Sequence, residues 1–154
     1  MKKILSLLLV IAMMVTLAVT VSAEETTACD LQVADVPVTD VNKDDITAAI
    51  TAAGGTADGT ATYDPVTNTL TLDNFSCSSD AFGGVINIQD GDITIKLKGN
   101  NTLSSTDEGT DGIYTNGNLA ICNGEDGVAQ GQLTINTVSS CIDAPSGTLE
   151  ITDV

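Results

Sequence analysis

The hydrophobic residues follow three successive patterns along the chain. An apolar run from Ile4 to Val21 comes first, a stretch with helical spacing follows at 44–53, and alternation of apolar and polar residues begins near Thr60. Apolar residues at every second position are typical of β-strands with one buried face. The pattern predicts an all-β domain that follows a leader and one short helix.

The first 23 residues have the features of a signal peptide. Lys2 and Lys3 precede the apolar run, and Val21-Ser22-Ala23 places small residues where signal peptidase cleaves. The alternatives are an uncleaved anchor, because 18 apolar residues can just span a bilayer, and a lipid-anchored Cys29. We expect cleavage, a secreted or extracellular location that includes the cell wall, and no membrane insertion afterwards.

One amphipathic helix is predicted between residues 44 and 53. Its apolar face consists of Ile46, Ala49, Ile50 and Ala53, at helical spacing. Asn42 or Asp44 is expected to cap its start, and Gly54-Gly55 to end it. Because a helix of about ten residues is marginal alone, this one must pack against other elements.

An extended piece from Leu31 to Thr39, interrupted by Pro37, precedes the helix. Two alternating segments, 60–63 and 69–72, follow it and flank turn-forming residues at 64–68. This arrangement predicts a β-hairpin.

Beyond residue 75, three segments align on a glycine. The glycines are Gly91, Gly117 and Gly147, at spacings of 117 − 91 = 26 and 147 − 117 = 30 residues. Aliphatic residues stand two and four places after each glycine: Ile93 and Ile95, Leu119 and Ile121, Leu149 and Ile151. Such a repeat is typical of a β-solenoid, in which the same strand of successive coils stacks in parallel. We expect the glycines to be equivalent left-handed corners, and Ile95, Ile121 and Ile151 to form one dry column.

The predicted fold is therefore an all-β, short parallel β-helix (β-solenoid) with an N-terminal capping helix and β-hairpin. Residues 1–23 are the signal peptide, 24–74 the N-terminal cap, and 75–154 the coils, which we expect to be truncated or covered at their C-terminal end. An antiparallel meander or a β-sandwich is the alternative, because the same alternation fits both.

Two stretches resemble a known family. Val36-Pro37-Val38-Thr39, with the segments 42–45 and 59–74, looks like the opening module of secreted β-helix repeat proteins from anaerobic gut Firmicutes. The segment 91–103 is similar to their coil repeats, and the resemblance covers roughly residues 31–151. It implies a right-handed, pectate-lyase-like β-helix of a kind often labelled carbohydrate-binding domain-containing. The longer helix and the cysteines depart from that pattern.

The charge excludes several partners. The chain has 21 acidic and 5 basic residues, no histidine and a net charge of −16, and every basic residue is a lysine. Cleavage after residue 23 leaves 3 − 21 = −18, which strongly disfavours nucleic acid and anionic membrane surfaces. Without histidine or arginine the equipment for acid–base catalysis is thin, so we do not expect an enzyme.

Four cysteines remain after cleavage: Cys29, Cys77, Cys122 and Cys141. An even number in an exported chain predicts disulfides, with three connectivities open. Free thiols are the alternative, and the spacing does not indicate zinc.

Calcium is the one cofactor that the sequence suggests. Asp107, Glu108 and Asp111 share one predicted corner, and Asp80 occupies the corresponding corner one coil earlier. Stacked coils would bring together carboxylate oxygens, which calcium prefers. A solvated acidic loop is the alternative.

Aromatic side chains are the usual platforms for sugars, and few are present. Tyr114 follows Ile113 in the alternation and is expected to face outward, which makes it the first ligand-binding candidate. Tyr63, beside the hairpin turn, is the second. Phe75 and Phe82 are expected to be buried.

These features favour a secreted or cell-surface, non-catalytic module that binds a polysaccharide or a host or cell-wall surface. The alternatives are a structural or adhesive spacer without a glycan ligand, and a fragment of a polysaccharide-degrading enzyme.

Overall fold

A computed structural model describes residues 27–80, 82–124 and 130–152 of the chain. The predicted signal peptide lies outside these residues. The described part is all-β apart from one helix, as predicted. No helix within it is long and apolar enough to cross a membrane.

The strands form two sheets that share one hydrophobic core. The first sheet has the order β11 (Ile142–Asp143), β8 (Thr110–Thr115), β5 (Gly83–Ile88), β1 (Ala28–Val33) and β2 (Val36–Thr39). The second has the order β10 (Gln132–Asn136), β7 (Asn100–Ser104), β4 (Thr69–Ser78), β6 (Ile93–Lys98), β9 (Leu119–Asn123) and β12 (Leu149–Thr152), with β3 (Thr56–Asp64) beside β4.

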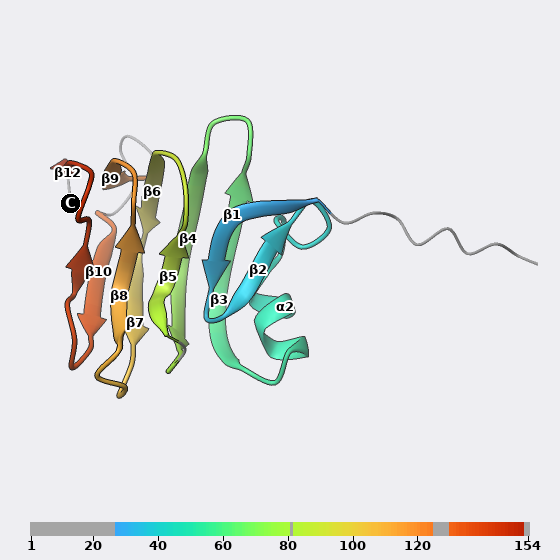
Figure 1. The fold of residues 1–154 in the computed structure, drawn as a ribbon. Helices are drawn as coiled ribbons and strands as arrows, with labels where there is room; N and C mark the ends of the chain where they lie inside the picture. Colours follow the sequence, from blue (N-terminus) through green and yellow to red (C-terminus); the bar gives the residue numbers. More distant parts are fainter. Residues whose placement is uncertain (1–26, 81, 125–129, 153–154) are drawn as a thin grey trace, which may run out of the picture.

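Equivalent strands of successive repeats pair in parallel and side by side (Figure 1). Ile95 on β6 lies opposite Ile121 on β9, which in turn lies opposite Ile151 on β12. The predicted column of three isoleucines is therefore confirmed in register. It is dry only in part, because Ile95 and Ile121 are buried whereas Ile151, on the last described strand, is 51% exposed.

The three repeat glycines stack on one another, but for two different physical reasons. Gly91 has a φ of +87°, the left-handed conformation that the sequence predicted. Gly117 and Gly147 do not have positive φ, so the prediction of left-handed corners was wrong for them. A Cβ on Gly117 would collide with the carbonyl oxygen of Gly91, and one on Gly147 with that of Gly117. Close backbone approach between repeats is what requires glycine there.

The predicted hairpin is confirmed as β3 and β4, which pair antiparallel with Tyr63 opposite Leu70. In the turn, Val66 N donates to Asp64 Oδ1 at 2.9 Å, and Asn68 has a φ of +48°. The first part of β4 pairs with β6 and its last three residues pair with β7. The second arm of the hairpin therefore starts both parallel stacks of the second sheet.

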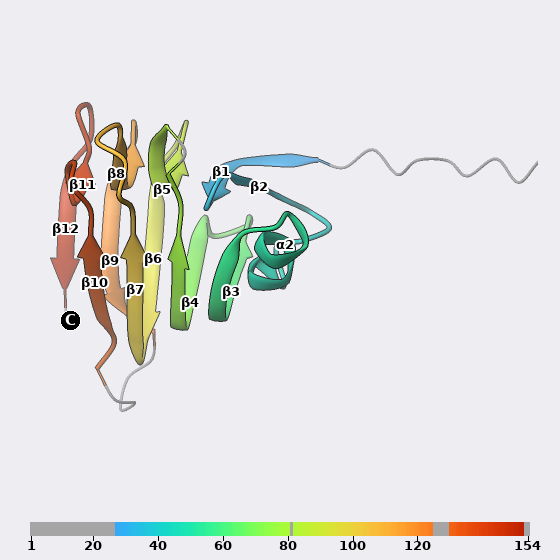
Figure 2. The same ribbon diagram turned by 90° about the horizontal axis from the view of Figure 1, so that it is seen from below.

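The helix α2 (Ile46–Ala52) is shorter than predicted and has a different cap. Asp45 Oδ1 accepts a 2.9 Å hydrogen bond from Ala48 N, whereas the predicted cap Asn42 accepts one from Thr39 N. Ile46 and Ile50 are buried, and the helix contacts β3. Figures 1 and 2 place α2 at the end of the strand array opposite β12, where an N-terminal cap was expected.

All four cysteines are free, so the predicted disulfides are not formed in this structure. Cys77 on β4 lies opposite Leu103, and Cys122 on β9 lies opposite Lys96 and Thr152. The cross-strand neighbours of Cys77 and Cys122 on the stacked strands are therefore not cysteines. Burial raises the pKa of the Cys77 thiol to about 12, which makes it an inert core side chain.

Candidate functional site

The outer face of the first sheet carries a groove of about 620 Å³. Four strands, β1, β5, β8 and β11, contribute one side chain each to its floor. These side chains are Gln32, Asn87, Tyr114 and Asp143. Gln32 pairs with Asn87, Asn87 with Tyr114, and Tyr114 with Asp143, so the four form one cross-strand row.

The alternation along the strands creates this row. Ile86 and Ile113 precede Asn87 and Tyr114 and are fully buried on the inner face of the sheet. Their successors must therefore point outward, because side chains alternate between the two faces of a strand. The outward position predicted for Tyr114 is confirmed, and the residue is half-buried among its neighbours.

Hydrogen bonds hold the Tyr114 ring in place at one side of the groove. Its hydroxyl donates to Asn116 Oδ1 at 3.0 Å, and Asn116 Nδ2 donates to the Gln89 carbonyl of the preceding repeat at 3.2 Å. The Asn116 amide thus connects the phenol to the backbone that follows β5 in the preceding repeat. A ring fixed in this way loses little conformational entropy when a ligand stacks on it.

The second aromatic wall is Phe82, whose predicted burial was wrong. Its side chain is 90% exposed and its ring lies beside Gly109, at the rim of the groove. Phe75 is fully buried, as predicted. Phe82 precedes β5, where no strand alternation fixes the direction of its side chain, and for that reason the sequence pattern missed it.

One amide in the floor has an unused acceptor. Asn87 Oδ1 is inaccessible to solvent and has no hydrogen-bond partner among the described residues. An unpaired acceptor in such a position costs free energy, typically about 1–3 kcal/mol.

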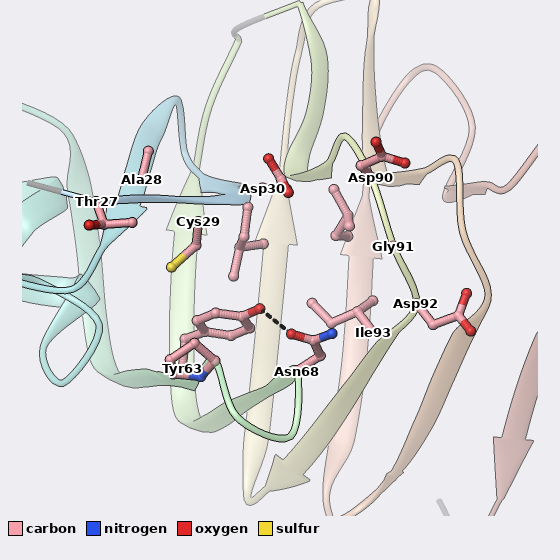
Figure 3. Close-up of a pocket in the computed structure, with 13 residues that line it drawn as sticks. Thr27, Ala28, Cys29, Asp30, Tyr63, Asn68, Asp90, Gly91, Asp92 and Ile93 are labelled. Atoms are coloured by element: carbon pink, nitrogen blue, oxygen red, sulfur yellow. Dashed lines mark hydrogen bonds between the residues drawn. The ribbon is translucent and has the colours of Figure 1, made fainter.

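Tyr63 lies in a separate cavity of about 500 Å³ between β1 and the hairpin turn (Figure 3). Its hydroxyl donates to Asn68 Oδ1 at 3.0 Å, and only 9% of the residue is exposed. The structure therefore does not bring the two tyrosine candidates together. Tyr63 stabilises the hairpin through its hydrogen bond to Asn68, and little of its ring is exposed to a ligand.

The hydroxyl of Tyr63 and the thiol of Cys29, which both line this second cavity, are held neutral. Burial raises the pKa of the Tyr63 hydroxyl, and the neighbouring Cys29 and Asp30 raise it further. Burial also raises the pKa of the Cys29 thiol, with a contribution from Asp40. Neither group is activated as a nucleophile, because the anionic form is disfavoured in both.

The four carboxylates proposed as calcium ligands do not gather around one position. Asp80 accepts from Thr106 N at 2.8 Å, and Asp111 accepts from Ser139 Oγ at 2.7 Å. Asp107 accepts from Gly109 N, and Glu108 is exposed. Across the described ranges no three acidic, cysteine or histidine side chains are arranged to hold a metal ion. Calcium binding stays a prediction that the sequence alone supports.

Asp80 and Asp111 instead link successive repeats. The donors to Asp80 lie 25 and 26 residues later in the chain, and those to Asp111 lie 28 and 29 residues later. Hydrogen bonds from the Thr106 backbone and the Ser105 hydroxyl lower the pKa of Asp80. Asp80 therefore contributes to stacking in its ionised form.

Asp80→Asn is expected to lower the melting temperature at neutral pH, because the charged acceptor of the Thr106 and Ser105 donors is lost. The folded-state pKa is lowered from 3.8, so this stability is present above that value and is lost as the pH falls through the lowered pKa. Melting curves from neutral to strongly acidic pH should converge for the variant and the wild type. Asp90→Asn is the control, because the Asp90 carboxylate is exposed and has no hydrogen bond to the described residues. A difference in melting temperature between Asp80→Asn and the wild type that stays constant at all pH values would contradict the role assigned to the Asp80 charge.

Comparison of the chain with protein-family models, with curated proteins and with solved structures gave no significant match. The resemblance to β-helix repeat proteins therefore rests on the residues of this chain alone.

Proposed function

We propose that this protein is a non-catalytic module that binds a polysaccharide in the groove around Tyr114. The observation that carries the proposal is a concave, outward sheet face with aromatic side chains and a row of amides. Sugars offer apolar ring faces for stacking and hydroxyl groups for planar polar side chains. Tyr114 and Phe82 supply the first kind of contact, and Gln32 and Asn87 supply the second.

The proposed architecture around the groove is a short right-handed β-solenoid with α2 and the hairpin as its N-terminal cap. In-register parallel pairing of β5 with β8, and of β6 with β9, supports this assignment. Parallel crossover connections are right-handed in about 98% of cases. A solenoid suits polysaccharide binding, because stacked repeats present an extended row of side chains to an extended chain.

The chemistry of the chain supports a binding role over catalysis. The sequence has no histidine and its basic residues are all lysines. Glycoside hydrolysis uses a pair of carboxylates, one of them as an acid, but in the groove Asp111 already accepts hydrogen bonds from Ser139 and Ser140 that favour its role as a link between repeats. The leader-like residues 1–23 support a secreted location, where polysaccharides are met.

Tyr114→Ala is expected to weaken polysaccharide binding about tenfold, as truncation of a central aromatic anchor typically does. The measurement is retention of the mature protein on insoluble chitin, chitosan, cellulose, xylan and pectin, followed by binding isotherms on the retaining material. Phe82→Ala should act in the same direction.

Tyr63→Phe is the matched control, since it alters a tyrosine outside the groove and leaves the ring in place. It should bind like the wild type. If the protein is retained on none of the polysaccharides, the proposed function is wrong. If the Tyr114→Ala variant is retained as well as the wild type, the binding site lies outside this groove. Without retention on any polysaccharide, a structural or adhesive spacer would be the better interpretation of the protein's function.

A further inference from the structure

The groove contains carboxylates but no cationic side chain. Asp111 and Asp143 line it, whereas the three described lysines lie elsewhere. Lys96 and Lys98 are on β6 of the second sheet, and Lys43 is near α2, where its Nζ is 3.0 Å from Asp44 Oδ1. An anionic ligand would therefore enter the groove against uncompensated negative charge.

Two acceptor groups beside Tyr114 in the row accept no hydrogen bond from the described residues. Asn87 Oδ1, on one side of Tyr114 in the row, is unpartnered. On the other side, the carboxylate of Asp143 accepts no hydrogen bond from the described residues. Asp111 Oδ1 already accepts from Ser139 and Ser140, whereas neither carboxylate oxygen of Asp143 does so, which makes Asp143 the first candidate to bind a ligand.

Asp143 lies beside the Tyr114 ring on the adjacent strand, in a position suited to a cation. Neighbouring strands are about 4.8 Å apart, so a sugar stacked on Tyr114 lies within reach of side chains on both adjacent strands. An ammonium group on that sugar can donate to a carboxylate, and a cation over an aromatic face is attracted to it. A sugar with a hydroxyl group at the same position can donate only a neutral hydrogen bond to the carboxylate, which is weaker than one from an ammonium group.

We propose that the groove selects amino sugars with a free ammonium group over N-acetylated, neutral and uronic acid sugars, with Asp143 as the residue that determines the preference. This inference rests on the proposed function and specifies its ligand class.

The test compares four β-1,4-linked tetrasaccharides, built from glucosamine, N-acetylglucosamine, glucose and glucuronic acid. The affinities are measured by calorimetric titration of the mature protein at about pH 6 and low salt, where exposed charge interactions are least screened. We expect the glucosamine tetramer to bind at least fivefold more tightly than the glucose and N-acetylglucosamine tetramers, and the glucuronic acid tetramer to bind most weakly. The preference should shrink in high salt, because screening weakens exposed charge interactions.

Two variants of equal charge separate a local effect from general attraction to an acidic protein. Asp143→Asn should bring the affinity for the glucosamine tetramer down to about that for the glucose tetramer. Asp58→Asn, on an exposed position of β3, should leave the preference intact. Equal losses in both variants would overturn the role of Asp143.

The outcomes distinguish this inference from the proposed function. Equal or tighter binding of the neutral, N-acetylated or acidic tetramer overturns the inference and leaves a glycan-binding groove. Failure of all four tetramers also overturns it, while retention on another polysaccharide would still support the proposed function.

Discussion

Asn101→Asp is expected to destabilise the domain by about 4 kcal/mol at neutral pH, a large share of the roughly 5–15 kcal/mol that stabilises a typical domain. Asn101 lies on β7, is 1% exposed and bridges three successive repeats through its amide. Its Oδ1 accepts from Phe75 N at 2.9 Å, one repeat earlier. Its Nδ2 donates to the carbonyl of Gln132 at 3.1 Å, one repeat later.

The aspartate keeps the acceptor but replaces the donor with a charged oxygen. That oxygen would face the carbonyls of Lys98, Gly99 and Gln132, which now receive bonds from Nδ2. A buried charge without a donor is strongly unfavourable, so the introduced carboxyl should have a raised pKa in the folded state. The loss should therefore be small at acidic pH, where the carboxyl is protonated in both states, and should grow as the pH rises through about 3.9, the ordinary aspartate value.

Asn100→Asp is the matched control, because it introduces the same charge one residue away on an exposed side chain. Urea unfolding at several pH values would measure both variants. We expect the control to change the free energy of unfolding by less than about 0.5 kcal/mol, as is usual for surface substitutions. A similar loss in both variants would show that added charge, and not the buried bridge, is responsible.

Gly117→Ala is expected to cost about 3 kcal/mol or more of folding free energy, at the upper end for overpacking. The atoms that the new methyl group would meet, Gly91 O and C and Asp92 N, all belong to the backbone. They cannot rotate away as a side chain would. Relief requires the two repeats to separate, which would weaken the ladder between β6 and β9 and the 2.9 Å hydrogen bond from Asn118 N to Asp92 Oδ1.

Gly91→Ala is the control at the equivalent position one repeat earlier. It meets no atom within 4 Å, and its cost is that of a left-handed alanine, about 1–2 kcal/mol. Thermal and urea unfolding of the two variants should therefore differ clearly. If they are equally destabilised, conformational freedom would explain both glycines and the close approach would be irrelevant.

Much of the fold could be read from the sequence because it depends on local rules. The period of two from Thr60 onward fixes which side chains face inward, and the turn residues at 64–68 fix the hairpin. The spacing of the three glycines sets the register in which Ile95 and Ile121 stack. The ends of a short helix are less well determined by the local sequence, and the helix cap is Asp45, one residue after the predicted Asp44.

The candidate site could be read only in part. The alternation placed Tyr114 outward, yet nothing local indicated that Phe82 is exposed beside the same groove. The partners of Tyr114 come from Gln32 on β1, Asn87 on β5 and Asp143 on β11, far apart in the chain. The acidic corner residues have the composition of a metal site, but stacking gives Asp80 and Asp111 backbone and hydroxyl donors instead.

The sequence by itself thus determined the strand class, the inward and outward faces, and the register of the repeats, because these follow from side-chain period and backbone conformation. Only the tertiary structure decided which outward side chains become neighbours, since adjacent repeats meet about 4.8 Å apart whatever their separation in the chain. That step turned Gln32, Asn87, Tyr114 and Asp143 into one row. It also left the four cysteines unpaired with one another, because Cys29, Cys77 and Cys122 lie on three different strands and Cys141 directly precedes β11.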